Sequence, residues 1–265
     1  MELPDHASKQ DHRGVTINNV GVCGVKYPIT IPMRDKTAQQ TIADIRMSVE
    51  LDKADKGTHM SRFVEVLEEV YNCNDKVFSP LSSNLLIERI RDRLDARVAY
   101  ITLEFEIFLK VLSPATAKRH LKPYGIRFEK NFNSQGRACD ALTVEVIGTA
   151  CCPCSKEISE YGAHNQKSII TLTVCPRIGE FVWFEDLIEK AESCFSSRTF
   201  PLLKRLDEKS VTESMYDNPK FVEDIIRDVY SRLDTSKYVA IEIRVENQES
   251  IHPHNAFAQI KKVFI

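Results

Sequence analysis

Residues 98–110 read VAYITLEFEIFLK, and apolar side chains recur at every second position of this stretch. A period of two is typical of a β-strand that buries one face and leaves the other near solvent. The segment therefore predicts a half-buried strand, and the elements around it decide what kind of sheet it joins. The expected inner face consists of Ala99, Ile101, Leu103, Phe105, Ile107 and Leu109.

A strand candidate, a second alternating strand and two helices precede this segment, and a weaker strand follows it. Pro28 interrupts the first strand, Thr58 can cap the first helix, and Pro80 opens the second helix at a position that tolerates proline. The order is strand, strand, helix, helix, strand, strand, over about 22–31, 41–51, 58–71, 80–94, 98–110 and 122–132.

The same order recurs in the second half of the chain. Its clearest helix, 219–233, carries a continuous apolar stripe, and we expect Asp217 or Asn218 to cap it with Pro219 in the first turn. The expected elements are strands at 141–148 and 168–175, helices at 181–194 and 219–233, and strands at 238–246 and 256–265. Two tandem ββααββ units predict an α+β fold, with helices on one face of antiparallel sheets.

Turn residues at 131–137 (NFNSQGR) place the junction between the two units. We therefore expect a polar N-terminal arm at 1–20, an N-terminal module at 21–134 and a C-terminal module at 135–265. An open sheet has two unpaired edges, which favours closure by partner subunits. The sequence thus predicts an oligomer.

The charge balance excludes several classes of partner. The chain has 265 residues, with 36 Lys and Arg against 38 Asp and Glu, for a formal net charge of −2. No extended basic field would attract nucleic acid or an anionic membrane surface. The polar N-terminus has no signal-peptide core, and no apolar run approaches the ~18 residues of a membrane span. We expect a cytoplasmic protein with no nucleic-acid or membrane partner.

The densest group of reactive side chains lies at 151–166, CCPCSKEISEYGAHNQ, between two predicted strands. A loop held at both ends by a sheet is a favourable place for a site. One of its cysteines and His164 could bind a divalent metal, since thiolate and imidazole suit Zn²⁺. Further ligands would then come from the ESIHPH stretch at 249–254 and from Glu208 or Glu213.

Two other interpretations of this cluster remain open. Cys151 and Cys154 have the Cys-x-x-Cys spacing of a redox pair, although the βαβ setting of thioredoxin-like proteins is missing. Alternatively, the thiols are small packed side chains. The number of reactive groups in so short a segment favours a site over simple packing.

A second candidate site lies at the start of the first helix. His59 and Arg62 stand in the sequence GTHMSRF, where helical N–H groups attract anions such as phosphate, and Lys156 could contribute from the cysteine loop. The simpler alternative is that Thr58 caps the helix and Arg62 is solvated. From the spacing alone, this alternative is slightly favoured over an anion site. No Walker A or G-x-G-x-x-G motif is present.

Five segments, taken together, resemble the type IB GTP cyclohydrolases. They occur in order along most of the chain: KGTHMSRF (56–63), CPCSKEISEYGAHNQ (152–166), LLKRLDEKSVTE (202–213), DNPKFVEDIIRD (217–228) and ESIHPHNAFA (249–258). The resemblance implies two tandem tunnelling-fold modules per chain, closed into a barrel as a homotetramer with active sites at subunit interfaces. It also implies hydrolysis of GTP to formate and 7,8-dihydroneopterin triphosphate, the first step of tetrahydrofolate biosynthesis. The cofactor would be a divalent metal ion. Mn²⁺ and Zn²⁺ are the first candidates, and Fe²⁺ is a further one.

The same resemblance assigns roles to individual residues. The metal ligands would be Cys152, His164, Glu208 and His252, with Glu213 as the alternative carboxylate. Cys152, His164 and His59 would take part in catalysis, whereas Glu249, Arg62 and Lys156 would bind the substrate. Glu249 would hold the guanine edge, because a carboxylate can accept two hydrogen bonds at once.

Two alternatives compete with this assignment. One is a related tunnelling-fold purine or pterin enzyme that uses its cysteine as a nucleophile. The other is a non-catalytic metal-binding or redox-sensing protein that uses Cys151 and Cys154. The sequence leaves open the physiological metal, the general acid and the role of Cys151.

Overall fold

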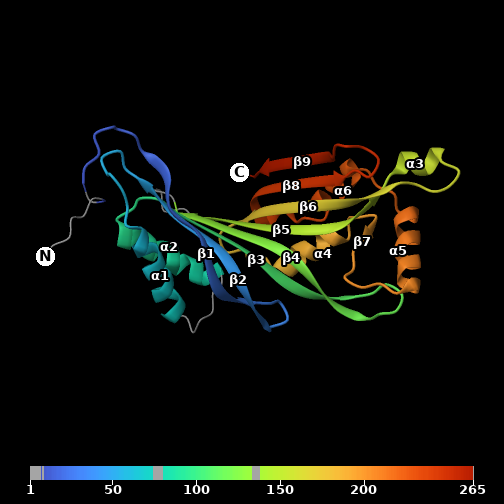
Figure 1. Cartoon of the computed structure of the whole chain (residues 1–265), viewed down its shortest axis with the longest axis horizontal. Coiled ribbons are helices and arrows are strands. Elements are labelled where there is room, and N and C mark those ends of the chain that lie inside the picture. The colour runs from blue at the N-terminus through green and yellow to red at the C-terminus, as the bar shows by residue number, and fades with distance from the viewer. Residues whose placement is uncertain (1–6, 8, 74–79, 133–137, 265) are drawn as a thin grey trace. The chain divides into compact units, whose positions relative to one another are not determined.

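The computed structural model describes residues 7, 9–73, 80–132 and 138–264 (Figure 1). Its strands are β1 (Ile17–Pro32), β2 (Ala38–Leu51), β3 (Ala99–Leu112), β4 (Arg119–Phe132), β5 (Ala138–Cys151), β6 (Asn165–Pro176), β7 (Ser197–Arg198), β8 (Tyr238–Gln248) and β9 (Ala256–Val263). Its helices are α1 (Met60–Cys73), α2 (Pro80–Leu94), α3 (Pro153–Ile158), α4 (Phe184–Glu192), α5 (Arg205–Asp217), α6 (Val222–Ser231) and a 3₁₀ turn at Thr235–Lys237. The expected α+β class is confirmed. Within the described ranges, no helix has the length and apolar character needed to cross a membrane.

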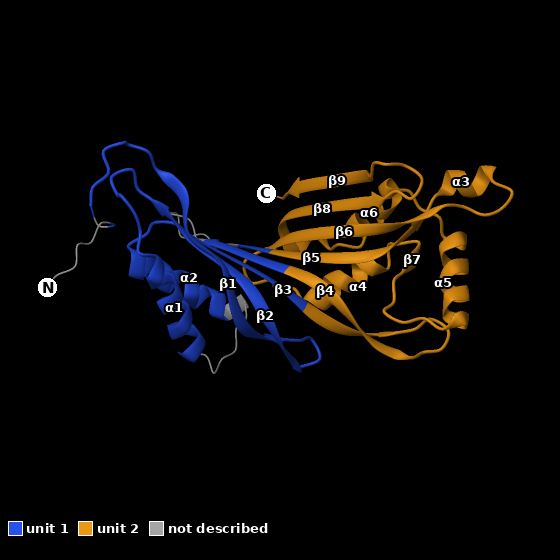
Figure 2. Cartoon of the chain, in the orientation of Figure 1, with its two compact units in different colours: residues 1–106, 127–141 blue, residues 107–126, 142–265 orange. Residues whose placement is uncertain are grey.

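Internal contacts divide the chain into two compact units (Figure 2). The first comprises residues 1–106 and 127–141, and the second comprises residues 107–126 and 142–265. The second unit thus includes the connected ends of β3 and β4. The predicted junction at 131–137 lies partly outside the described residues, and the division into modules 21–134 and 135–265 stays a prediction.

In the first unit, antiparallel pairing joins β1 to β2 and β2 to β3. Alternate residues of β2 and β3, including Met47 and its partner Ile101, are buried, as the period of two predicts. Pro28 lies within β1 opposite Ile42 and does not break the strand. β1 pairs on one side with β2 and is an edge strand, where the missing proline N–H is tolerated.

In the second unit, the strand order is β5-β6-β8-β9, and β7 pairs with β5. One face of these strands is buried through alternate residues such as Leu172 and Ile243. α4 packs on β6, and α6 packs on β8 and β9. The apolar stripe predicted for α6 is buried at Val222, Ile225, Ile226 and Val229.

The register of this sheet brings two important connections together. Cys151 pairs with Asn165, and Lys167 pairs with Gln248. Asn247 in turn pairs with Ala256. Segments 152–164 and 249–255 therefore leave the sheet at the same end, although about ninety positions separate them in the sequence.

The structure corrects three further local expectations. α6 begins at Val222 after Phe221, so the predicted cap by Asp217 or Asn218 is wrong. Asp217 instead ends α5, and Asn218 is its C-cap in a non-helical conformation, which Pro219 favours. The cysteine segment is not entirely loop, because it contains the short helix α3. α1 begins at Met60, so His59, rather than Thr58, directly precedes it.

Candidate active site

Cys152 lies at the N-cap of α3, directly after β5. Its backbone is extended (φ −72°, ψ 118°), and Pro153 opens the helix at a position where no N–H is needed. The Sγ atom accepts a hydrogen bond from the amide of Ser155 at 3.5 Å. The extended N-cap conformation and this hydrogen bond together fix the direction of the Cys152 side chain.

His164 lies at the other end of the same loop and is tied to Cys152. The Cys152 amide donates to the His164 carbonyl oxygen at 3.1 Å. The Ser155 hydroxyl accepts from the His164 amide at 3.2 Å and donates to the Cys152 carbonyl at 3.1 Å. The thiol and the imidazole thus come from two residues fixed at the base of one loop.

The His164 ring presents an unpaired polar atom. Its Nδ1 is buried, and no described residue forms a hydrogen bond with it. A buried polar atom without a partner costs free energy, so such atoms usually have a ligand, an ion or water in the working protein. An imidazole nitrogen and a thiol, here from two residues whose main chains are bonded, are donor types that suit Zn²⁺ and similar divalent ions.

The other predicted ligands lie on neighbouring segments of the second unit. His252 is exposed in the β8–β9 connection, and its ring stacks on His254 at 5.1 Å. Glu249 is half-buried just after β8. Among the described residues, no three His, Cys, Asp or Glu side chains come close enough to hold a metal ion. The structure therefore brings together Cys152 and His164 but not the complete predicted set.

Helix α5 carries both candidate carboxylates and is fixed at both ends. At its C-terminal end, the Lys156 ammonium donates to the Tyr216 carbonyl and lies 4.2 Å from the centre of the Tyr216 ring. With a rise of 1.5 Å per residue, Glu208 lies about 12 Å along the axis from Tyr216 and Glu213 about 4.5 Å. Glu213 pairs with Lys209 at 3.7 Å, whereas the Glu208 carboxylate has no partner among the described residues.

Asp207, next to Glu208, fixes the N-terminal end of α5. Its fully buried carboxylate accepts hydrogen bonds from the Ala115 and Thr116 amides at 3.0 and 2.8 Å, and from the Lys204 amide at 3.0 Å. Burial raises the pKa of this carboxyl, but the hydrogen bonds outweigh burial and lower the pKa to about 2. No motif in the sequence indicates this role, although acidic residues are typical of a first helical turn.

His59 and Arg62 lie in the first unit and line a cleft of about 250 Å³. Arg62 Nη1 donates to the Arg93 carbonyl at 3.4 Å. The cleft is also lined by Arg97, which belongs to none of the sequence motifs, and by several carboxylates, among them Asp52. The cleft is therefore lined by both positively and negatively charged side chains.

The fold and the cysteine loop define the class of protein first. The chain is similar in structure to a uricase from Bacillus fastidious, with a TM-score of 0.57, 10% identity, and coverage of 96% of this chain and 94% of that one. At this identity the likeness concerns the fold alone, and it supports a tunnelling-fold-like α+β protein.

Sequence comparison then gives the family. Residues 3–258 match the family described as type I GTP cyclohydrolase folE2. The chain is 41% identical over 260 residues to GTP cyclohydrolase FolE2 of Syntrophobacter fumaroxidans, covering 97% of this chain and 98% of the relative. It is 42% identical over 261 residues to that of Geotalea uraniireducens, covering 98% and 93%. The chain belongs to the type I GTP cyclohydrolase folE2 family, which confirms the resemblance of its motifs.

Proposed function

We propose that this chain hydrolyses GTP to formate and 7,8-dihydroneopterin triphosphate in a metal-dependent reaction that begins tetrahydrofolate biosynthesis. One observation carries the proposal beyond family membership. The motif residues Cys152 and His164 are tied together by main-chain contacts, and the buried Nδ1 of His164 has no partner among the described residues.

Cys152 and His164 fit a divalent ion such as Zn²⁺, Mn²⁺ or Fe²⁺ through the sulfur and the imidazole nitrogen. A divalent ion held here would supply Lewis-acid activation of the water that attacks C8 of the guanine ring. His252 would complete the nitrogen ligands, because its connection leaves the sheet at the same end as the cysteine loop. His59 and His164 are candidates for moving the proton during ring opening.

The carboxylate ligand comes from α5, and the structure makes its identity testable. The family motif favours Glu208, whose carboxylate has no described partner. Glu213 lies closer to the contact between Tyr216 and Lys156, but it pairs with Lys209. Glu208→Gln and Glu213→Gln form a matched pair, because both variants keep the length of the side chain on the same helix. The true ligand is the one whose amide variant loses metal.

Glu249, Arg62, Lys156 and His59 would bind the substrate. The half-buried Glu249 follows β8 and would accept hydrogen bonds from the guanine edge. Arg62 and His59 line a cleft and would bind the triphosphate. Lys156 contacts Tyr216 here, so it would have to exchange that contact for a phosphate oxygen.

We propose a homotetramer in which sheet edges from different subunits pair and close a barrel, with active sites at the subunit interfaces. β9 supports this assembly, because it is an edge strand with Phe257 and Val263 59% and 80% exposed. Unpaired, apolar edges are normally covered in native proteins. The expected tetramer can be measured by light scattering during size-exclusion chromatography.

The decisive experiment measures formate release from GTP together with metal content. The wild-type protein is expected to release formate and to form a product that becomes a fluorescent neopterin after oxidation and dephosphorylation. Cys152→Ala should lose bound metal and activity. Cys154→Ala is the matched control, because Cys154 is an exposed thiol two residues away. Full activity in Cys152→Ala would refute the proposed site.

A further inference from the structure

The peptide groups of Cys151 are held from outside the β5–β6 pairing. The Cys151 amide donates to the Ser196 hydroxyl at 3.1 Å. The Cys151 carbonyl accepts from the Lys220 amide at 3.0 Å. Cys151 immediately precedes Cys152, so these two bonds fix the backbone from which the Cys152 side chain projects. Ser196 follows α4 and Lys220 precedes α6, which means that neither contact is local in sequence.

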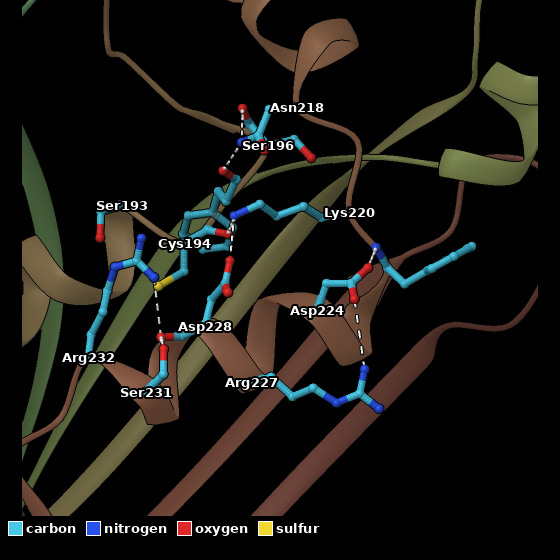
Figure 3. Close-up of polar contacts among 12 residues, drawn as sticks. Ser193, Cys194, Ser196, Asn218, Lys220, Asp224, Arg227, Asp228, Ser231 and Arg232 are labelled. Atoms are coloured by element: carbon cyan, nitrogen blue, oxygen red, sulfur yellow. Dashed lines mark hydrogen bonds and ion pairs between the residues drawn. The ribbon is translucent and has the colours of Figure 1, made fainter.

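The segment 218–220, which provides the Lys220 amide, is held by side-chain hydrogen bonds to residues 194–196, which follow α4, and to α6 (Figure 3). The Lys220 ammonium donates to the Cys194 carbonyl at 3.0 Å and to the Asp228 carboxylate at 2.7 Å. The Asn218 side-chain amide donates to the carbonyls of Phe195 and Ser196 at 3.1 and 3.3 Å.

The Lys220–Asp228 contact is the more enclosed of two ion pairs that involve residues of α6. The Lys220 side chain is 14% exposed and that of Asp228 is 39% exposed, and the two charged groups lie at hydrogen-bonding distance. The other pair joins Arg227 to Asp224 at 3.8 Å, with Arg227 73% exposed. An exposed pair at this distance contributes little, whereas a charge-assisted hydrogen bond from a mostly buried lysine is stronger. Removing the cation of each pair in turn therefore compares the effect of the Lys220 pair with that of an exposed pair on the same helix.

We infer that Lys220 and Ser196 are positioning residues. They set the direction of the Cys152 thiol by hydrogen bonding to the carbonyl and the amide of Cys151, respectively. Lys220 acts through its own amide, while its side chain holds that amide in place. The inference rests on the proposed role of Cys152 as a metal ligand. It explains why a shielded lysine lies next to the cysteine loop without belonging to the predicted ligand set.

The test uses Co²⁺ as the probe and the full-length protein freed of metal. A cobalt–thiolate bond gives a charge-transfer absorption band, so the spectrum reports directly on the bond to Cys152. Lys220→Met and Ser196→Ala should each weaken Co²⁺ binding by roughly five-fold, the effect of one net hydrogen bond, and should lower or shift the band. Lys220→Met should also lower kcat more than it raises KM for GTP.

Matched controls separate positioning from general stability. Arg227→Met removes a cation from the other ion pair, and Ser193→Ala removes a hydroxyl that donates to the Lys190 carbonyl near the end of α4. Both should keep the wild-type band and affinity. Thermal midpoints of all four variants, measured without metal, show how much each loses in stability alone.

The possible outcomes are distinct. A charge-transfer band that persists in Cys152→Ala would show that the proposed ligand is wrong. If Cys152→Ala abolishes the band but Lys220→Met and Ser196→Ala match their controls, the positioning inference fails while the proposed function stands. Ser196→Ala provides the answer if Lys220→Met does not fold, since it deletes only one hydroxyl oxygen.

Discussion

The Cys152 amide donates a hydrogen bond to the carbonyl oxygen of His164, 3.1 Å away. This bond closes the loop that contains α3 and sets the two strongest metal-ligand candidates at one end of the sheet in the second unit. The loop is further braced by Ser155, whose hydroxyl contacts the main chain of both residues. The relative position of the thiol and the imidazole therefore depends on a few identifiable bonds.

Ser155→Ala should weaken metal binding without unfolding the protein. The variant loses the acceptor for the His164 amide and the donor to the Cys152 carbonyl. A net loss of about 1 kcal/mol corresponds to roughly five-fold weaker binding in a chelator competition. Ser159→Ala is the control, because its hydroxyl accepts from the nearby Tyr161 amide and forms no other hydrogen bond with the described residues. Equal affinities of the two variants would contradict the bracing role.

Gly148→Ala should destabilise the second unit. A Cβ at Gly148 would lie 2.2 Å from ring atoms of Phe195, a buried side chain that cannot move away easily. Overpacking of this kind costs about 1–3 kcal/mol of unfolding free energy, measurable by urea denaturation. Gly125→Ala should be nearly neutral, because its added Cβ would meet the Cβ of Glu145 at an ordinary 3.7 Å.

Lys122→Met should be among the most destabilising single changes in the second unit. Lys122 and Glu192 form a buried ion pair at 2.6 Å, and the Tyr124 hydroxyl donates to the same carboxylate oxygen at 2.7 Å. Burial lowers the pKa of Lys122, and the neighbouring Glu192 partly opposes this shift. Removing Lys122 leaves the buried Glu192 carboxylate with the half-exposed Arg198 guanidinium, 3.6 Å away, as its remaining counter-charge. The expected cost therefore lies at the lower end of the about 3–5 kcal/mol for a broken buried pair.

The double variant Lys122→Met with Glu192→Leu distinguishes two costs: the loss of the ion pair and the burial of a carboxylate without its lysine partner. It should recover part of the lost stability, because no uncompensated charge then remains inside. Equilibrium unfolding of both variants measures the difference. A double variant less stable than the single one would contradict this explanation.

Thiol labelling should distinguish Cys73 from Cys194 in the native protein. Cys73 is exposed, whereas Cys194 is buried and burial raises the pKa of its thiol. The buried Cys194 forms less thiolate than an ordinary thiol at neutral pH and is shielded from the reagent, so Cys73 should be labelled far faster than Cys194 in the native protein. Mass spectrometry of timed samples gives both rates, and Cys194 should react freely only in denaturant. Equal native rates would rule out the burial described for Cys194.

The strands and most helices could be predicted because each has its own periodic signal. The alternation in 98–110 became β3, and the predicted helix 219–233 became α6 apart from its first three and last two residues. α5 gave no comparable signal. The only buried residue of α5 is Asp207, a carboxylate held by the distant amides of Ala115 and Thr116. Hydrophobic periodicity cannot reveal a helix whose inner contact is polar.

The sequence by itself determined the α+β class, the family and the loop that carries Cys152 and His164, because these depend on local patterns and on motifs within short stretches. Only the tertiary structure decided what holds that loop. The contacts from Lys220 and Ser196 to Cys151 join residues that are about 69 and 45 positions apart. Such contacts exist only after α4, α6 and the sheet have packed, and no local pattern encodes them.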